Sequence, residues 1–154
     1  MKSTGTPRRS TAERVSDFLE RLVAERDVWL STSHPDHGPH QVPLWFLWDG
    51  QAVWMCTSAT SPTVRNIRVE PRVHLSLPDT FDVVLIRGEA ECFPDHEVPG
   101  AAADAYVEKF GWDTRTEEGD FVYVRVTPNS ARAWRGEPEL RGRVIMREGI
   151  WLSY

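Results

Sequence analysis

The sequence predicts a single domain of the α+β class, a mostly antiparallel β-barrel with helices at its periphery. Its length of 154 residues suits one hydrophobic core. Six or more short segments with strand character, each bounded by turn residues, fill most of the chain. Helical patterns occur only near the start, in the middle and once late, so helices and strands do not alternate as they do around a parallel sheet.

The composition excludes several classes of protein. Acidic residues number 23 against 18 basic, a net charge of -5, whereas a nucleic-acid binder usually carries a basic excess. Apolar runs such as residues 83–86 are far shorter than the roughly 20 residues that span a membrane. Residues 1–9 are polar, contain no apolar signal sequence and predict a disordered tail before a domain over residues 10–154. We therefore expect a cytoplasmic protein with neither nucleic-acid nor membrane partners.

Two further counts are informative. The two cysteines, Cys56 and Cys92, lack the spacing of metal ligands and are too few for a disulfide scaffold, so we expect reduced, buried thiols. The chain also has seven tryptophans, a high number for its length. Flat aromatic surface beyond what a small core needs indicates a subunit interface or a planar ligand.

The N-terminal half begins with a helix and continues as strands. Ser10 and Glu13 form the S-x-x-E capping box that starts a helix. Apolar residues then recur at helical spacing and predict a face that packs on the core: Val15, Phe18, Leu19, Leu22 and Val23. The expected strands of this half cover residues 28–32, 41–48 and 52–57. Turn residues at 35–39 and the Asp49-Gly50 dipeptide separate these strands.

The second half combines two short helices with longer strands. Ser61 is a good N-cap and Pro62 suits the first position of a helix over residues 62–69. A later helix over residues 101–110 ends at a glycine. Gly88, inside a long strand, predicts a bulge or a close approach of two backbones. The expected strands cover residues 72–77, 82–93, 120–127 and 131–134, and a small hairpin covers residues 143–151.

The strongest chemical signal is the passage from the third strand into the first short helix. A helix start presents unpaired backbone N–H groups at the positive end of the helix dipole, which suits a phosphate. Hydroxyl groups gather at the same place, on Thr57, Ser58, Thr60, Ser61 and Thr63. Arg65 and Arg68 are close enough in sequence to add positive charge. The simpler interpretation is that Ser61 only caps the helix and the rest is a polar loop.

Three histidines, His34, His37 and His40, have an H-x-x-H-x-x-H spacing that could hold zinc in an open site. Prolines at positions 35 and 39 predict an irregular loop, however, and no fourth ligand completes the set. A solvated loop is the preferred interpretation, and we assign no metal ligands.

The segment from Trp134 to Arg143 combines arginines and glutamates with a tryptophan. Such a segment could close over a planar, negatively charged ligand, because arginine offers bidentate donors and a flat face for stacking. A subunit-interface loop tied by surface ion pairs explains the same composition equally well.

Motifs for other chemistries are absent from the sequence. It contains no G-x-S-x-G nucleophile elbow, no Walker A loop and no G-x-G-x-x-G fingerprint. We therefore expect neither nucleophilic catalysis nor a Rossmann-type dinucleotide site, and we name no catalytic acid or base.

An ordered set of short motifs carries a family resemblance over roughly residues 15–151. The motifs are Gly38-Pro39, Pro43-Leu44-Trp45-Phe46, Trp48-Asp49-Gly50, Thr57, Ser61 with Arg65-Asn66-Ile67, Glu70-Pro71-Arg72-Val73 and Gly88-Glu89-Ala90. With this order the chain resembles the split β-barrel flavin-binding superfamily of pyridoxamine 5′-phosphate oxidase and the deazaflavin F-420-dependent reductases. It is more similar to the short actinobacterial members than to the oxidase itself.

The resemblance implies a homodimer that binds FMN or F-420 across the subunit interface and oxidises or reduces a small molecule by hydride transfer. It assigns the cofactor phosphate to Thr57, Ser58, Ser61, Thr63, Arg65 and Asn66. It further implies that Trp134 and Arg143 of the other subunit frame the cofactor ring. In such enzymes the cofactor performs the redox chemistry, and the protein supplies orientation and electrostatics.

Several positions depart from the family pattern. The family usually has basic residues where Pro62 and Thr63 stand, and the oxidase has further basic residues in place of Gln41 and Phe46. Each lost charge-assisted hydrogen bond costs about 1.5–3 kcal/mol, which allows weak binding or a different cofactor. The oxidase's substrate-phosphate residues are not reproduced either, so pyridoxamine phosphate oxidation is not expected.

Three hypotheses follow from the sequence. The leading one is an FMN- or F-420-dependent oxidoreductase. The second is a non-catalytic split-barrel protein that carries or senses a flavin, haem or a related tetrapyrrole. The third is a dimer that has lost its cofactor, which predicts a melting temperature that does not respond to flavins.

Overall fold

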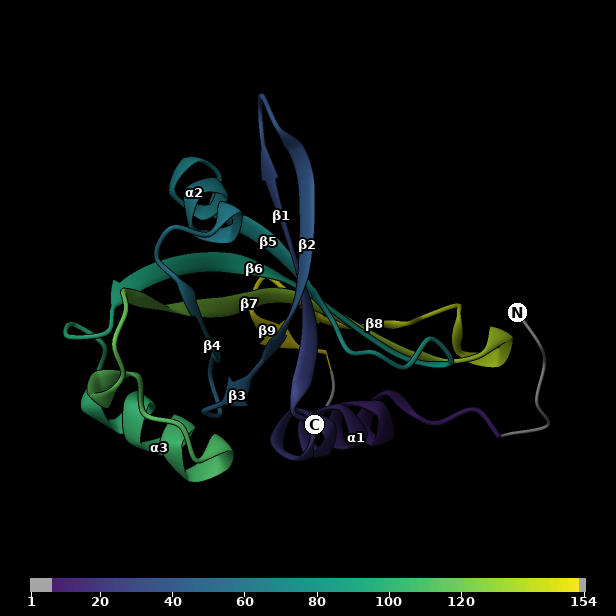
Figure 1. Ribbon diagram of the computed structural model, residues 1–154. Helices are drawn as coiled ribbons and strands as arrows, with labels where there is room; N and C mark the ends of the chain where they lie inside the picture. The colour runs from purple at the N-terminus through teal and green to yellow at the C-terminus, as the bar shows by residue number, and fades with distance from the viewer. Residues whose placement is uncertain (1–6, 153–154) are drawn as a thin grey trace.

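The computed structural model describes residues 7–152, which form one curled antiparallel sheet with three α-helices around it (Figure 1). The strand order is β2-β1-β5-β6-β7-β4-β3, with β8 beside β7 and β9 beside β8. The strands are β1 (Asp27–His34), β2 (Gly38–Trp45), β3 (Leu47–Trp48), β4 (Val53–Ser58), β5 (Arg72–Ser76), β6 (Asp82–Pro94), β7 (Phe121–Arg135), β8 (Val144–Arg147) and β9 (Ile150–Trp151). The helices are α1 (Thr11–Ala24), α2 (Pro62–Val69) and α3 (Gly100–Phe110), with 3-10 turns at Thr114–Thr116 and Glu137–Glu139. The predicted α+β class and the half-barrel architecture are confirmed.

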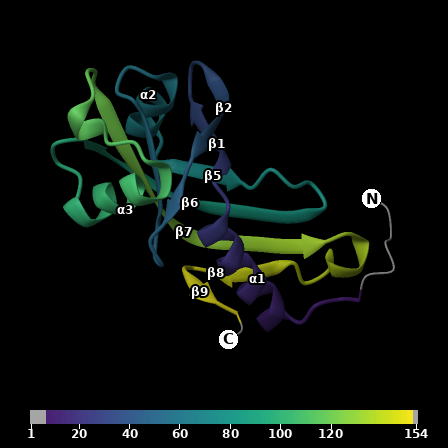
Figure 2. The same cartoon turned by 60° about the horizontal axis from the view of Figure 1, so that its bottom comes forward.

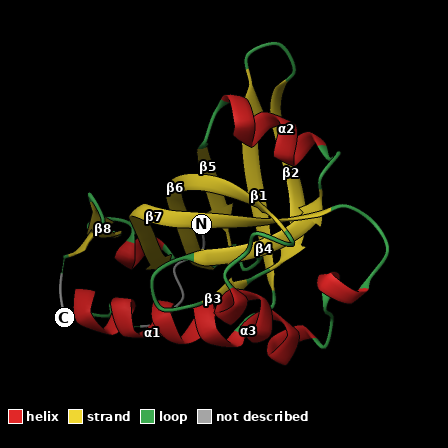
Figure 3. Cartoon of the chain, turned by 90° about the vertical axis from the view of Figure 1, so that its left-hand side faces the viewer, coloured by secondary structure: helices red, strands yellow, loops and turns green. Residues whose placement is uncertain are grey.

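The helices lie at opposite ends of the half-barrel. Helix α2 covers one end, whereas α1 and α3 lie side by side at the other (Figures 1 and 3). No helix within residues 7–152 is long and apolar enough to cross a membrane.

Helix α1 starts where the capping box predicts. The Ser10 hydroxyl accepts the N–H of Glu13 at 3.1 Å, and the Glu13 carboxylate accepts the N–H of Ser10 at 2.6 Å. Phe18 and Leu22 are buried as expected. Val23, expected on the same face, is 66% exposed, because it lies at the edge of the apolar stripe in the last turn. The prediction for Val23 was wrong.

Strands β6 and β7 form the long central ribbon of the sheet, and both extend well beyond the neighbouring strands (Figure 2). The sequence predicted two strands, 120–127 and 131–134, where the structure has β7 as one continuous strand. The interruption at Pro128 is absorbed in the sheet, because Pro128 pairs with Gly88 next to the register shift between Arg87 and Gly88. That shift confirms the irregularity expected at Gly88.

The first hairpin differs from its prediction at both ends. Strands β1 and β2 pair as far as His34 and Gly38, so the expected loop at 35–39 is shorter than predicted. The strand expected over 41–48 divides into β2 and β3, with the buried Phe46 between them. The division lets β2 pair with β1 while β3 pairs with β4 at the far edge of the sheet.

A main core fills the half-barrel, and a second cluster lies under α3. Tyr106 of α3 packs there with Trp54 and Tyr123, and the Tyr106 and Tyr123 rings meet edge to face at 5.5 Å. Cys56 belongs to this cluster, and burial raises the pKa of its thiol to about 12. This thiol therefore stays protonated and packs as an apolar side chain.

The expected disordered tail, residues 1–9, falls partly outside the described residues, which begin at Pro7. Arg9 is half-buried and pairs with Asp17 and with Glu139, which lies 130 residues away in sequence. The N-terminal segment is therefore attached to the far end of β7.

Candidate functional site

The corner between β4 and α2 places the predicted hydroxyl groups together. Thr57 and Ser58 end β4, and Ser61 is the N-cap of α2, with its hydroxyl accepting the Val64 N–H at 3.3 Å. The Ser58 and Thr60 hydroxyl groups are 3.1 Å apart. The side chains of Ser58 and Thr60 are exposed, so both can reach a ligand.

Few backbone donors remain free at this helix start. The Ser61 N–H donates to the Ser58 carbonyl at 3.1 Å, and the Arg65 N–H donates to the Ser61 carbonyl at 3.2 Å. Pro62 has no N–H, and Ser61 caps Val64. Among the described groups, the Thr63 N–H is the donor of this first turn that is left without an acceptor. Because Thr63 is 1% exposed, the corner offers an anion mainly its exposed hydroxyl groups.

Two of the predicted phosphate residues face inward. The side chains of Thr63 and Asn66 are buried, and the Asn66 amide donates to the Thr32 hydroxyl at 3.1 Å. Arg65 is exposed, and its Nε and Nη2 atoms both donate to the Asn66 amide oxygen at 3.2 Å. The positive charge of Arg65 is the main cause that lowers the pKa of His37 on the β1–β2 turn. Thr63 and Asn66 thus hold α2 on the barrel.

The predicted ring residues are brought into contact. The Arg143 guanidinium carbon lies 5.6 Å from the centre of the Trp134 ring, a cation–π arrangement. Arg143 also donates from Nη1 to the Leu140 carbonyl at 2.8 Å. The Trp134 indole N–H is buried and has no hydrogen-bond partner in residues 7–152. A buried donor without an acceptor is costly, so this N–H is a site that a ligand acceptor would stabilise.

The two groups of predicted residues lie apart within one chain. Helix α2 and the end of β7 that carries Trp134 are on opposite sides of the molecule (Figures 1 and 2). One copy of the chain therefore cannot place the ring residues beside its own β4–α2 corner.

A buried charge network, which sequence reasoning missed, holds the segment between Trp134 and Arg143. Glu139 is 1% exposed and accepts hydrogen bonds from the Arg9 side chain at 2.8 and 3.0 Å. It also accepts the backbone N–H groups of Arg9 at 2.7 Å and Arg135 at 2.6 Å. Arg14 is 2% exposed and donates to the Gly142 carbonyl at 2.7 Å. A signal for Arg14 was present, because it precedes Phe18 by four residues and shares its buried face.

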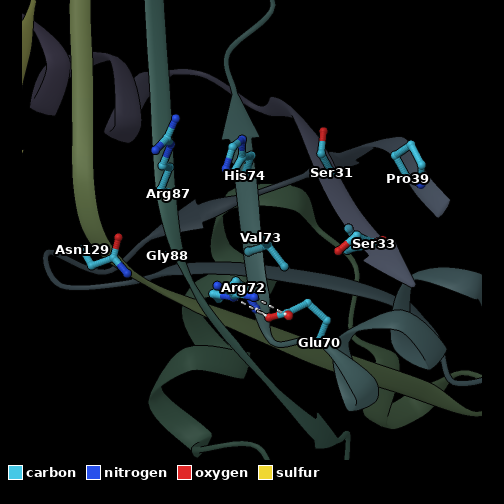
Figure 4. Close-up of a pocket in the computed structure, with 11 residues that line it drawn as sticks. Ser31, Ser33, Pro39, Glu70, Arg72, Val73, His74, Arg87, Gly88 and Asn129 are labelled. Carbon is cyan, nitrogen blue, oxygen red and sulfur yellow. Dashed lines mark hydrogen bonds and ion pairs between the residues drawn. The ribbon is translucent and has the colours of Figure 1, made fainter. Parts of the chain in front are cut away.

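An open hollow of about 530 Å³ lies on the outer face of the sheet (Figure 4). Its wall consists of Ser31, Thr32, Ser33, Pro39, Glu70, Arg72, Val73, His74, Arg87, Gly88 and Asn129. Arg72 pairs with Glu70 at 2.8 Å at one side of this hollow. None of the eight predicted cofactor residues lines it, although Pro39, Gly88 and part of the Glu70-Pro71-Arg72-Val73 segment lie in its wall and belong to the motifs that carry the family resemblance.

The three histidines are not gathered around a common point. His34 and His40 lie on β1 and β2 rather than on an irregular loop, which corrects the prediction. The His34 Nδ1 accepts the N–H groups of Asp36 at 3.1 Å and His37 at 3.4 Å. Among residues 7–152, no three side chains of the types that bind metal ions meet.

A family model and several solved structures are similar to this chain. The model of the pyridoxamine 5′-phosphate oxidase family matches residues 12–135. No curated protein sequence matches the chain. A structure described as an F420 reductase is similar at 24% identity with a TM-score of 0.60, covering 73% of this chain and 93% of that chain.

Two other solved structures show how widely the fold is shared. A conserved hypothetical protein from Mycobacterium tuberculosis is 26% identical with a TM-score of 0.62, over 88% of this chain and 90% of that one. HutZ, the haem storage protein from Vibrio cholerae, is 16% identical with a TM-score of 0.59, over 76% of this chain and 89% of that one. The fold therefore occurs in proteins with different names and ligands.

Proposed function

The chain belongs to the pyridoxamine 5′-phosphate oxidase family, and from that premise we propose that it is a homodimeric oxidoreductase that uses FMN or F-420. The single observation that supports this proposal most is the contact of Arg143 with the ring of Trp134, whose buried N–H has no partner within residues 7–152. A flat ring with acceptor atoms matches both a cation–π surface and an unpaired donor.

The described residues fit such a cofactor in part. The hydroxyl groups of Ser58 and Thr60 would bind a phosphate, with Thr57, Ser61 and Arg65 around them. Thr63 and Asn66 would support the helix rather than touch the ligand, since their side chains are buried. The corner has no basic side chain at positions 62 and 63. We therefore expect the few contacts with the phosphate to limit the affinity for the cofactor.

The separation of the two half-sites supports the proposed homodimer (Figures 1 and 2). Because Trp134 and Arg143 cannot reach the β4–α2 corner of their own chain, a second copy must supply them to complete one site. Each dimer would then contain two equivalent sites, as closed twofold symmetry requires.

The bound cofactor would supply hydride transfer to or from a small-molecule substrate. The chain's own residues would orient the ring and set its electrostatic surroundings. The Trp134 N–H would donate to a ring acceptor, and Arg143 would place positive charge beside the ring, where it stabilises developing negative charge. Leu140 fixes Arg143 through the 2.8 Å hydrogen bond to its carbonyl.

A non-catalytic carrier of a flavin or a tetrapyrrole is the second candidate function. The observation that favours it is the small number of phosphate donors at the β4–α2 corner, where Pro62 replaces a charged donor. A carrier binds its ligand without turnover, so a reductant and an artificial electron acceptor distinguish the two functions.

Titration of the cofactor-free protein with FMN and with F-420, followed by ligand fluorescence, tests the proposal. We expect saturable binding of one of them at one per subunit. If neither FMN nor F-420 binds at concentrations up to roughly 100 μM, the proposal is contradicted. That limit corresponds to a binding free energy of about 5–6 kcal/mol at best.

Arg143→Ala tests the residue assignment within that experiment. Removal of the guanidinium should weaken binding of the flavin or deazaflavin about tenfold, because one charge-assisted contact is lost. The matched control is Arg141→Ala, an exposed arginine of the same segment, which should bind within twofold of wild type. Equal binding by all three proteins would show that Arg143 does not touch the cofactor.

A further inference from the structure

A row of basic side chains, one histidine and three arginines, crosses the outer face of the sheet. His74 on β5 lies directly opposite Arg87 on β6. Arg132 on β7 pairs with Leu85, two residues from Arg87, so Arg87 and Arg132 are diagonal neighbours at roughly 7–8 Å. Arg143 follows beyond β7, where its carbonyl accepts the Ala133 N–H at 2.9 Å. We call His74, Arg87, Arg132 and Arg143 the cationic row.

The cationic row lies along three adjoining hollows. The first is the hollow of about 530 Å³ that holds His74 and Arg87, which stand next to one another on neighbouring strands (Figure 4). A small hollow of about 60 Å³ shares both residues and adds Arg132. The third, of about 400 Å³, shares Arg132 and adds Arg143 and Arg147. Neighbouring hollows share wall residues, so the three follow one another along the cationic row, and together we call them the trough.

In the part of the chain that the structure describes, the three arginines of the row have no carboxylate partner, as is also true of seven of the other thirteen arginines. The remaining six form ion pairs with carboxylates: Arg9, Arg21, Arg72, Arg115, Arg125 and Arg135. Within residues 7–152, no carboxylate therefore neutralises the positive charge of Arg87, Arg132 and Arg143.

The positive charges of the row also repel one another. The pKa of Arg132 is lowered by burial and by the charges of Arg87 and Arg143. The pKa of His74 is lowered by burial and by the charges of Arg87 and Arg132. Like charges on facing strands destabilise a sheet unless a counter-charge neutralises them. Hydroxyl and amide groups of Ser31, Ser33 and Asn129 line the same trough and add hydrogen-bonding partners for such a counter-charge.

We propose that the cationic row binds the anionic part of the substrate, a small molecule with two or more phosphate or carboxylate groups. Arginine suits this chemistry, because its planar fork binds such groups with two parallel hydrogen bonds. The row spans from β5 to the edge of β8, which at about 4.8 Å per strand places the outer charges roughly 10–14 Å apart. Arg87 and Arg132 bind the anionic groups, and the reacting end of the substrate lies toward Arg143. This inference rests on the proposed function, since Arg143 marks the place of the cofactor ring.

Calorimetric titration with pyrophosphate at fixed ionic strength tests the row directly. The full chain should bind one pyrophosphate per subunit, and the His74 imidazole resonances should shift on binding. Arg87→Gln with Arg132→Gln should weaken binding at least tenfold, whereas the matched control Arg141→Gln should change it less than twofold. The double variant removes like-charge repulsion, so its melting temperature without ligand should equal or exceed that of wild type. The proposal is overturned if the double variant still binds pyrophosphate as wild type does. It is also overturned if Arg141→Gln weakens pyrophosphate binding as much as the double variant does.

A second arm distinguishes the substrate from the phosphate of the cofactor. Protein saturated with FMN should still bind pyrophosphate, because Arg87 and Arg132, which bind the anionic groups, lie beyond Arg143 and the cofactor ring. Loss of pyrophosphate binding on saturation with FMN would overturn the substrate assignment, since both would then occupy one site. If the protein binds no flavin but still binds pyrophosphate through these arginines, the proposed function is rejected and the anion site is retained.

Discussion

The most buried charges of the protein converge on Glu139. Burial alone would raise the pKa of this carboxyl group, but the Arg9 side chain and the N–H groups of Arg9 and Arg135 outweigh it and lower the pKa to about 2. The unfolded value is about 4.3. Ionised Glu139 therefore stabilises the fold above that value, and the stabilisation is lost as the pH falls from about 4.3 through about 2.

Glu139→Gln is expected to lower the free energy of unfolding by about 3 kcal/mol at pH 7, because Arg9 loses its buried counter-charge. The glutamine does not titrate, so the deficit relative to wild type should shrink by about 2 kcal/mol between pH 7 and pH 3. Urea unfolding at both pH values measures the two differences. A deficit that is the same at both would mean that Glu139 is not ionised in the folded protein.

At the scale of elements, the ribbon of β6 and β7 depends on one glycine. A Cβ atom at Gly88 would lie 2.5 Å from the Thr127 carbonyl oxygen and 2.8 Å from a Val126 methyl group. The two backbones approach this closely where the register shifts, and the neighbour that would have to move is itself backbone. Strand β7 can therefore continue through Pro128 because Gly88 has no side chain.

Gly88→Ala should destabilise the protein by about 3 kcal/mol, since the added methyl group overpacks a fixed contact. Gly100→Ala is the matched control, because a Cβ atom there meets nothing within 4 Å and the residue begins α3. That control should stabilise the protein by about 0.5–1 kcal/mol through helix propensity. The denaturant midpoints of the two variants should thus move in opposite directions. If both midpoints move in the same direction, the close approach of the β6 and β7 backbones at Gly88 is refuted.

For the whole molecule, the sequence predicted what is encoded locally. The capping box at Ser10, the N-cap at Ser61 and the irregularity at Gly88 each depend on a few neighbouring residues, and the structure has all three. The Arg9–Glu139 pair joins positions 130 residues apart, so no local pattern could have indicated it.

The candidate site was predictable only in part for the same reason. Hydroxyl groups clustered in sequence were visible, but whether Thr63 and Asn66 face a ligand or the core depends on how α2 packs. The cationic row arises from the register of four strands, which no single segment contains. Features built across the sheet therefore required the structure.

The exposed aromatic surface gives the last prediction, which concerns the assembly. Trp29 is 39% exposed on the outer face of β1, between Pro43 of β2 and Ser76 of β5. If two copies bury this face against each other, wild type should have twice the 17.6 kDa mass of the chain in light scattering, and Trp29→Glu should dissociate it by burying a charge.

The same variant tests whether the site is shared between subunits. Monomeric Trp29→Glu should bind FMN or F-420 at least tenfold more weakly, because Trp134 and Arg143 of a second copy would no longer reach the β4–α2 corner. Val23→Glu places the same charge at a 66% exposed apolar position on α1 and should leave both mass and affinity unchanged. A monomer that binds the cofactor as tightly as wild type would place the whole site within one chain and remove the reason for the dimer.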